Sequence, residues 1–217
     1  MSLEKELKII FYKHKKMLKQ KINERKDKIQ LEENRHWEIY ELLGDFDKEE
    51  SFKVDYYQNA GRYFFRHCGS MLEEMVIKII KNKKYAEKIY IENTISTNPK
   101  RFEIDCFVKE DNKGHEIKWR DATTDGDHRK KEETKLKQMI KNGIKPVKLM
   151  FYMPEREQAK KIQLSIIELY NQTGESHVGK QAWSYLKNYC DFDLYNFLFE
   201  KRYEDINDEL PNLDEFL

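Results

Sequence analysis

The apolar positions near the start of the chain recur every three or four residues, which is the period of an α-helix. This pattern predicts an amphipathic helix over residues 1–30, with its repeating positions at Leu3, Leu7, Ile10, His14 and Met17. Similar spacing predicts a second helix over about residues 33–43 and a third over about residues 57–81. The first part of the chain is therefore expected to be helical.

The pattern changes after the third predicted helix, where apolar and polar positions alternate as they do along a half-buried β-strand. Three successive strands are predicted, marked by Ile89 and Ile91, then Phe102, Ile104, Cys106 and Val108, then His115, Ile117 and Trp119. Residues 111–114 between the last two strands are short and turn-like, so these strands should form an antiparallel hairpin.

The rest of the chain returns to helices around one further strand. A polar helix is predicted over about residues 130–141, an apolar strand over residues 147–153, and a helix that starts at Pro154 and ends near residue 170. Residues 180–199 are rich in aromatic residues and also have a helical pattern. The predicted order is a helical segment, three strands, a helix, a strand and a helix.

The composition is that of one folded, soluble domain over residues 1–217. The aromatic share is 13%, and the chain has only 8 Gly and 4 Pro, with no flexible linker and no internal repeat. A chain of this length buries roughly 70% of the surface of its unfolded form. No apolar run approaches the ~18 residues of a membrane span, and the 3 scattered Cys suit reduced thiols, so we expect a cytoplasmic protein without a membrane partner.

Charge is spread unevenly along the chain, although the formal net charge is only +1. Residues 1–30 and 129–148 carry clear surpluses of Lys and Arg, whereas residues 203–217 form an acidic tail without a basic residue. Clustered positive charge is typical of a surface that binds phosphates. The alternative is that these segments are ordinary solvated helix faces.

The predicted hairpin separates apolar from ionic side chains. Residues two apart in a strand share a face, so Glu103 and Asp105 lie opposite the apolar positions of their strand, and Glu116 and Lys118 do the same on the next strand. The hairpin brings Asp105 near Glu116, with Lys118 one step further along. Two close carboxylates favour a bound cation, and oxygen ligands favour Mg²⁺. A solvated face crossed by a Lys–Glu pair is the alternative.

These residues also resemble a family. Asp105, followed after a short hairpin by EIK at 116–118, looks like the D…(D/E)xK signature of the PD-(D/E)XK nuclease superfamily, although the residue before Asp105 is Ile104 where that signature has Pro. GSMLEE at 69–74 resembles the glycine-then-acid helix of the superfamily. With EIKWRDATTDGDH and YFFRHCGSMLEE, the chain is similar over most of residues 55–200 to type II restriction endonucleases of the ApaLI kind.

The resemblance implies a mixed α/β fold with a restriction-endonuclease-like core, in which helices flank a central mixed sheet. Residues 55–200 would form this core, residues 1–50 a helical extension, and further helices the C-terminal end. Asp105 and Glu116 would bind Mg²⁺, with Mn²⁺ as a substitute, together with the backbone carbonyl of Ile117. Lys118 would assist the nucleophile. Gly69 would allow close packing, and Glu73 would face the metal, with Glu74 as the equivalent candidate.

The function implied is that of a homodimeric endonuclease that cuts double-stranded DNA at a palindrome, with GTGCAC as the suggested site and a cognate DNA methyltransferase as genetic partner. A repair nuclease of the same superfamily and a non-catalytic DNA-binding module are the alternatives. No phosphate-binding Gly-rich loop is present, so no nucleotide cofactor is expected. The candidate DNA contacts are Arg62, Arg66, Arg120, Thr123, Thr124, Asp125, Asp127, His128 and Lys130.

Overall fold

The computed structural model describes residues 1–32, 37–121, 123 and 127–199, and these form two compact units. The first unit runs from Met1 to Met71, and the second begins at Leu72 and is described as far as Phe199. The acidic tail at 203–217 lies outside the described residues. The single nuclease domain expected over residues 1–217 stays a prediction.

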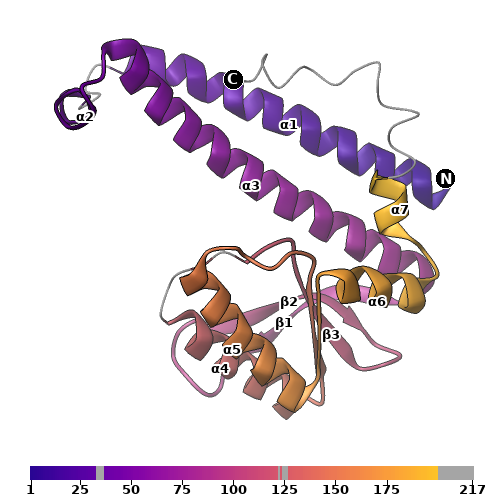
Figure 1. Cartoon of the computed structure of the whole chain (residues 1–217). Helices are drawn as coiled ribbons and strands as arrows, with labels where there is room; N and C mark the ends of the chain where they lie inside the picture. The colour runs from indigo at the N-terminus through magenta and orange to yellow at the C-terminus, as the bar shows by residue number, and fades with distance from the viewer. Residues whose placement is uncertain (33–36, 122, 124–126, 200–217) are drawn as a thin grey trace. The chain divides into compact units, whose positions relative to one another are not determined.

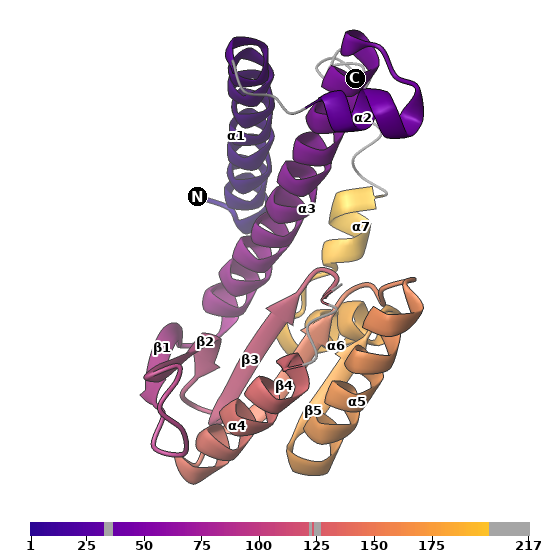
Figure 2. The same ribbon diagram turned by 90° about the vertical axis from the view of Figure 1, so that its left-hand side faces the viewer.

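The first unit is helical, as its sequence pattern predicts. It contains α1 (Leu3–Leu31), α2 (Glu38–Gly44) and the first part of α3 (Lys48–Lys83). Figures 1 and 2 show α1 and α3 side by side and running in opposite directions. Helix α1 begins after Ser2, whose hydroxyl accepts the Lys5 N–H at 3.4 Å and so caps the first turn.

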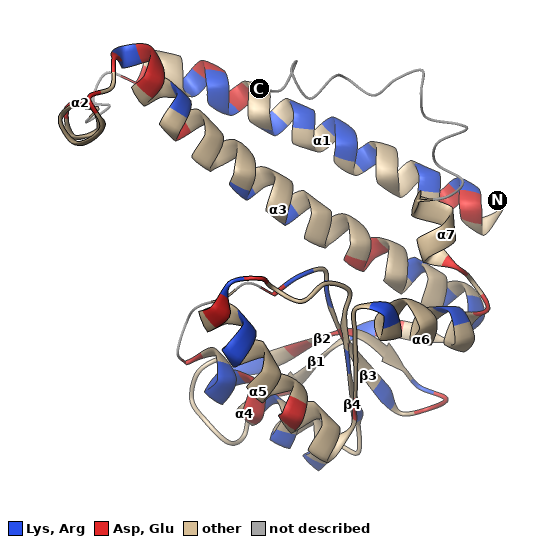
Figure 3. Ribbon diagram, viewed as in Figure 1, with Lys and Arg blue, Asp and Glu red and all other residues tan. Residues whose placement is uncertain are grey.

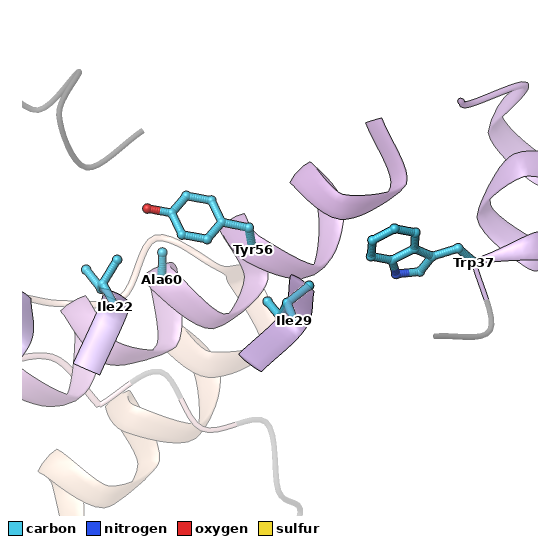
Figure 4. Packing of buried hydrophobic residues seen from close by; sticks show 5 residues of the cluster. All are labelled: Ile22, Ile29, Trp37, Tyr56 and Ala60. Carbon is cyan, nitrogen blue, oxygen red and sulfur yellow. The ribbon is translucent and has the colours of Figure 1, made fainter. Parts of the chain in front are cut away.

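The core of this unit lies where the C-terminal half of α1 packs against α3. Its buried members, drawn in Figure 4, are Ile22, Ile29, Trp37, Tyr56 and Ala60. The carboxylate of Asp55 accepts hydrogen bonds from the Trp37 indole at 2.8 Å and from the Tyr40 hydroxyl at 3.1 Å. Apolar packing and this shared acceptor together fix the chain around α2 against α3.

Helix α3 begins at Lys48 and not near residue 57, as the spacing predicts. Asp47 and Glu50 exchange hydrogen bonds between side chain and backbone, at 2.9 Å and 2.8 Å. This is a capping box, which satisfies two free N–H groups at the helix start. The polar stretch that follows hid the helix from a search for apolar spacing, although the D-x-x-E pattern was present in the sequence.

The second unit contains a five-stranded sheet with the strand order β1-β2-β3-β4-β5. Strands β1 and β2 pair antiparallel, as do β2 and β3, whereas β3–β4 and β4–β5 are parallel. The predicted hairpin is confirmed, and so is the mixed sheet. The strands are β1 (Ala86–Glu92), β2 (Arg101–Val108), β3 (Lys113–Lys118), β4 (Lys145–Met150) and β5 (Glu175–Val178).

Helices cover both faces of this sheet. Helices α4 (His128–Lys141) and α5 (Glu157–Thr173) pack against each other and on β4, as Figure 2 shows. On the other face the Tyr185 hydroxyl of α6 (Lys180–Cys190) lies 2.9 Å from Nε2 of His115. A short helix, α7 (Leu194–Phe199), follows. The mixed α/β class with a sheet between helices is confirmed.

Two predictions for the C-terminal part are wrong. Helix α5 begins at Glu157 after Arg156, and not at Pro154. Strand β5 was not predicted, because its four residues, ESHV, contain a single β-branched residue and show no clear alternation. Its parallel pairing with β4, from Val147↔Glu175 to Met150↔Val178, is a long-range contact that local sequence does not encode.

Two general expectations concern the cysteines and membranes. Cys68, Cys106 and Cys190 are thiols outside any disulfide, as predicted, and the last two are buried. None of the helices in the described ranges combines the length and the apolar character that a bilayer crossing requires.

Two glycines differ sharply in the space around them. A Cβ at Gly174, where α5 ends and the chain turns into β5, would lie 2.0 Å from the carbonyl oxygen of Pro146. At Gly69, inside α3, no atom of the described residues lies within 4 Å of the Cβ position, apart from its chain neighbours and the backbone of its own helix. The expectation that Gly69 permits close packing is therefore wrong for the described chain, whereas Gly174 is required by the approach of two backbones.

The same substitution at these two positions should have opposite effects on the free energy of unfolding. Gly174→Ala should destabilise by about 2–3 kcal/mol, because a backbone carbonyl cannot move aside as a side chain can. Gly69→Ala should stabilise by about 0.5–1 kcal/mol, since Ala favours a helix interior over Gly. Urea unfolding followed by circular dichroism measures both, and a loss of stability at Gly69 would contradict the open space described there.

Candidate active site

The hairpin of β2 and β3 places Asp105, Glu116 and Lys118 together on one face of the sheet. The Lys118 Nζ lies 2.7 Å from Glu116 Oε1 and 3.8 Å from Asp105 Oδ2. The register of the hairpin, in which Cys106 pairs with His115, sets Asp105 across from Glu116. The structure therefore brings these three predicted side chains into one cluster.

This ionic face is buried and is not the solvated strand face that was the alternative. Asp105 is 6% exposed and Glu116 is 5% exposed. Helix α4 covers the face, and its Lys135 donates to Oε2 of Glu116. Lys118 is the accessible member, with a third of its side chain exposed. The Lys118 side chain is therefore more accessible than that of either carboxylate.

The carboxylate of Asp105 is fixed by the backbone of the neighbouring strand. Its Oδ2 accepts the N–H of Ile117 at 2.8 Å, next to the last pair of the β2–β3 ladder. A side-chain acceptor thus takes the place that a strand carbonyl would otherwise have. This bond sets the direction of the carboxylate and satisfies a buried backbone donor.

Glu116 lies between two ammonium groups. Burial alone would raise the pKa of its carboxyl, but Lys135 and Lys118 hold that pKa well below its usual range. Burial alone would likewise lower the pKa of Lys118, but Glu116 and Asp105 outweigh burial and raise it. Glu116 is therefore a carboxylate and Lys118 an ammonium across the whole physiological range.

Asp105 differs from Glu116 although the two are neighbours. Burial, and then the negative charge of Glu116, raises the pKa of Asp105 to about 7, against the opposing effects of Lys118 and the Ile117 N–H. Lys135 donates to Glu116 and not to Asp105. The negative charge of this cluster is therefore balanced at Glu116 and in excess at Asp105.

Glu73, on the part of α3 that belongs to the second unit, lies near this cluster. Burial raises its pKa, and the charges that act on it include those of Lys118 and Glu116. Asp105 is in turn affected by Glu73. Within the described ranges, however, no group of three His, Cys, Asp or Glu side chains is close enough together to hold a metal ion.

Sequence reasoning missed a layer of charged residues behind the cluster. Lys148 of β4 is 1% exposed, is the register partner of Glu116, and lies 5.5 Å from the ring of Tyr170. The Tyr170 hydroxyl donates to Glu132 of α4 at 3.2 Å. The signal for α4 was available, because four of its positions form one helical stripe that faces the sheet: Glu132, Lys135, Leu136 and Met139.

The remaining predicted DNA contacts are scattered. Thr124 and Asp125 lie outside the described residues, Asp127 and Lys130 are exposed, and Thr123 donates its N–H to Asp121 at 3.3 Å. His128 is already engaged, with Nε2 at 3.0 Å from Asp121, and the guanidinium of Arg120 lies 4.9 Å from the ring centre of Trp119. Arg62 and Arg66 belong to the first unit. Their roles in binding DNA stay predictions.

Comparison with protein families shows which family the chain belongs to. The model of the ApaLI-like restriction endonuclease family matches residues 1–202. The chain belongs to this family. It is therefore a type II restriction endonuclease, a nuclease that acts on DNA, as the resemblance of its hairpin and α3 implied. The comparisons with curated proteins and with solved structures found no match.

The contact between Lys135 and Glu116 makes a prediction about the stability of the endonuclease. Lys135→Met removes one of the two ammonium groups on a buried carboxylate, so the free energy of unfolding should fall by about 2–3 kcal/mol. Lys137→Met on the same helix is the control; it breaks an exposed pair with Glu133 and should change stability by less than about 0.5 kcal/mol. Urea denaturation measures both.

A double-mutant cycle with Glu116→Gln tests whether the loss of stability in Lys135→Met comes from the charge on Glu116. Once the carboxylate is neutral, Lys135→Met should have a much smaller effect, because no unpaired buried charge is left. Equal losses in the two backgrounds would show that Lys135 contributes by packing and not by its charge.

Proposed function

We propose that this endonuclease hydrolyses phosphodiester bonds of double-stranded DNA at a short palindromic site, using Mg²⁺ or, as a substitute, Mn²⁺. The proposal rests chiefly on the cluster itself: Lys118 Nζ lies 2.7 Å from Glu116 and 3.8 Å from Asp105. Two carboxylates beside one ammonium offer a cation site next to a charged hydrogen-bond donor. Both are what hydrolysis of a phosphate diester requires.

The donor chemistry of the cluster fits a hard divalent cation. Asp105 and Glu116 present carboxylate oxygens, which Mg²⁺ prefers. The raised pKa of Asp105 reflects burial and a repulsion from Glu116 that a nearby cation relieves. We propose the Ile117 carbonyl as a further ligand and Glu73 as an outer ligand. When bound, the cation supplies Lewis acidity, which polarises a phosphoryl oxygen and lowers the pKa of water.

Lys118 acts as a charged donor in this proposal and not as a base. The carboxylates beside it raise its pKa, so it keeps its proton at neutral pH and cannot remove one from water. The ammonium of Lys118, whose side chain is 33% exposed, can instead donate to the non-bridging oxygens of the scissile phosphate. These oxygens gain negative charge as water attacks phosphorus, so the interaction strengthens in the transition state.

Two further groups act through the ligands. The N–H of Ile117 holds the Asp105 carboxylate in place, and Lys135 holds Glu116 from the side of α4. A ligand that is already oriented loses little conformational freedom on binding a cation. Lys135 is thus a positioning residue, whereas Lys118 touches the substrate.

The details of recognition follow from family membership and symmetry. A palindromic site is matched by a twofold axis, so we propose that the endonuclease acts as a homodimer. GTGCAC is the site that we propose, and a methyltransferase that modifies the same site is the proposed genetic partner, since it would protect the host DNA.

Loss of either Lys118 or Asp105 should abolish most cutting. Lys118→Ala and Asp105→Asn should each lower the rate of plasmid cleavage by at least about 100-fold, the usual effect of removing a group that stabilises the transition state. Lys137→Ala, an exposed lysine on α4, is the matched control and should cut as the wild type does. Retained DNA binding with unchanged cutting in Lys118→Ala would point to a residue outside the chemistry.

The dependence on metal and the ends of the fragments test the proposal as a whole. Plasmid DNA incubated with the protein and Mg²⁺ should yield discrete fragments that share an end sequence, and EDTA should stop the reaction until Mg²⁺ is returned in excess. Sequencing of the ends identifies the site. Nicks that follow DNA structure would indicate a repair nuclease, and binding without cleavage would indicate a DNA-binding module.

A further inference from the structure

The first unit contains a groove between α1 and α3 that the proposed chemistry does not use. Its volume is about 690 Å³. The residues that line it come from one face of each helix: Lys21, Glu24, Arg25 and Lys28 of α1, and Asn59, Arg62, Tyr63, Phe65 and Arg66 of α3. Tyr63 also packs against the apolar core of the unit, so the floor of the groove rests on buried side chains.

The charge of the groove is strongly positive. Five of its lining residues are basic and one is acidic. Lys21 pairs with Glu24 at 2.7 Å, and Arg25 pairs with Glu32. Figure 3 shows how densely basic residues are spaced along α1. The groove therefore keeps a net positive charge after its own carboxylate is counted.

Two arginines of α3 are the most available cations. Arg62 and Arg66 are one helical turn apart and exposed, and neither forms an ion pair with a residue that the structure describes. Each guanidinium carries five N–H donors in a planar fork that matches phosphate oxygens. The two guanidinium groups lie on one face of α3, opposite the basic face of α1. Together they present more N–H donors than the groove has acceptors for.

The length of the basic stripe favours a polymer over a single small anion. Lys21 and Lys28 are two turns apart, which is about 10 Å along the axis of α1. One strand of B-DNA presents a phosphate every ~3.4 Å along its axis, so about three phosphates fall within that length. Contacts to phosphates carry no sequence information by themselves.

We propose that this groove binds the phosphate backbone of the DNA substrate and supplies affinity that is independent of sequence. The inference rests on the proposed function, because it takes double-stranded DNA as the substrate. The proposed hydrolysis remains with the second unit, and the groove of α1 and α3 adds contacts to the DNA backbone.

The test is the salt dependence of DNA binding by the full chain. Each phosphate contact contributes about 0.9 to the slope of log K against log salt concentration. Arg62→Gln/Arg66→Gln should therefore make this negative slope shallower by about 2, so that binding at 0.1 M salt is weakened roughly 60-fold more than binding at 1 M. Fluorescence anisotropy measures it with a labelled duplex of arbitrary sequence in EDTA, so no cleavage occurs.

Two matched variants separate the groove from charge in general. Lys5→Gln/Lys16→Gln removes the same charge from exposed positions of α1 that do not line the groove, and it should leave the slope near that of the wild type. Arg62→Lys/Arg66→Lys keeps the charge and should restore most of the slope. Fragments cut by the glutamine variant should keep the ends of the wild-type fragments, since the groove reads no bases.

The outcomes distinguish this inference from the proposed function. A wild-type slope in the glutamine variant, an equal loss in the Lys5/Lys16 control, altered fragment ends, or tighter binding of an RNA duplex would each overturn it. A protein that binds DNA with the expected slopes but never cuts it would overturn the proposed function and leave the groove as a phosphate-binding surface.

Discussion

The candidate cluster on β2 and β3 depends on one buried carboxylate that is held between two ammonium groups. Glu116 is 5% exposed, and its removal from water is strongly unfavourable unless its charge is balanced. Lys118, on its own strand, and Lys135, across from α4, supply that balance. Any rearrangement that moved α4 away from β3 would leave a buried charge with half of its partners. The electrostatics of a single side chain thus tie the helix layer to the strand on which we propose that the chemistry takes place.

The same constraint explains why the two carboxylates behave differently. Glu116 keeps its negative charge because both lysines approach it. Burial and this negative charge together raise the pKa of Asp105, which is 6% exposed, to about 7. The divalent cation that we propose would relieve the same repulsion at Asp105 as a proton does, so the two would compete. The Ile117 N–H holds the Asp105 carboxylate in place. The backbone therefore sets the orientation of the Asp105 carboxylate, and the surrounding charges determine what binds to it.

The sequence was sufficient for the parts of the site that are local. Asp105, Glu116 and Lys118 lie on adjacent strands of one hairpin, so the period of two and a short turn were enough to bring them together. Lys135 reaches the cluster from α4, and Lys148 lies beside Glu116 on β4. The positions of α4 and β4 follow from packing of the whole sheet. The capping box at Asp47 and the stripe of α4 that contains Glu132 were visible in the sequence but did not enter the predictions. Strand β5 depends on pairing with β4, which no local pattern reveals.

The division into two units suggests how affinity and chemistry are shared in this endonuclease. The cluster that we propose for hydrolysis needs charges that are matched, buried and fixed, because its effect depends on geometry at one phosphate. A backbone-binding groove needs the opposite: exposed cations that lack partners, whose effect is summed over several phosphates and screened by salt. Arg62 and Arg66 have the second character and Lys135 has the first, although all three are cationic side chains on helices. The number and burial of the carboxylates around a lysine or arginine therefore say more about its role here than the residue type does.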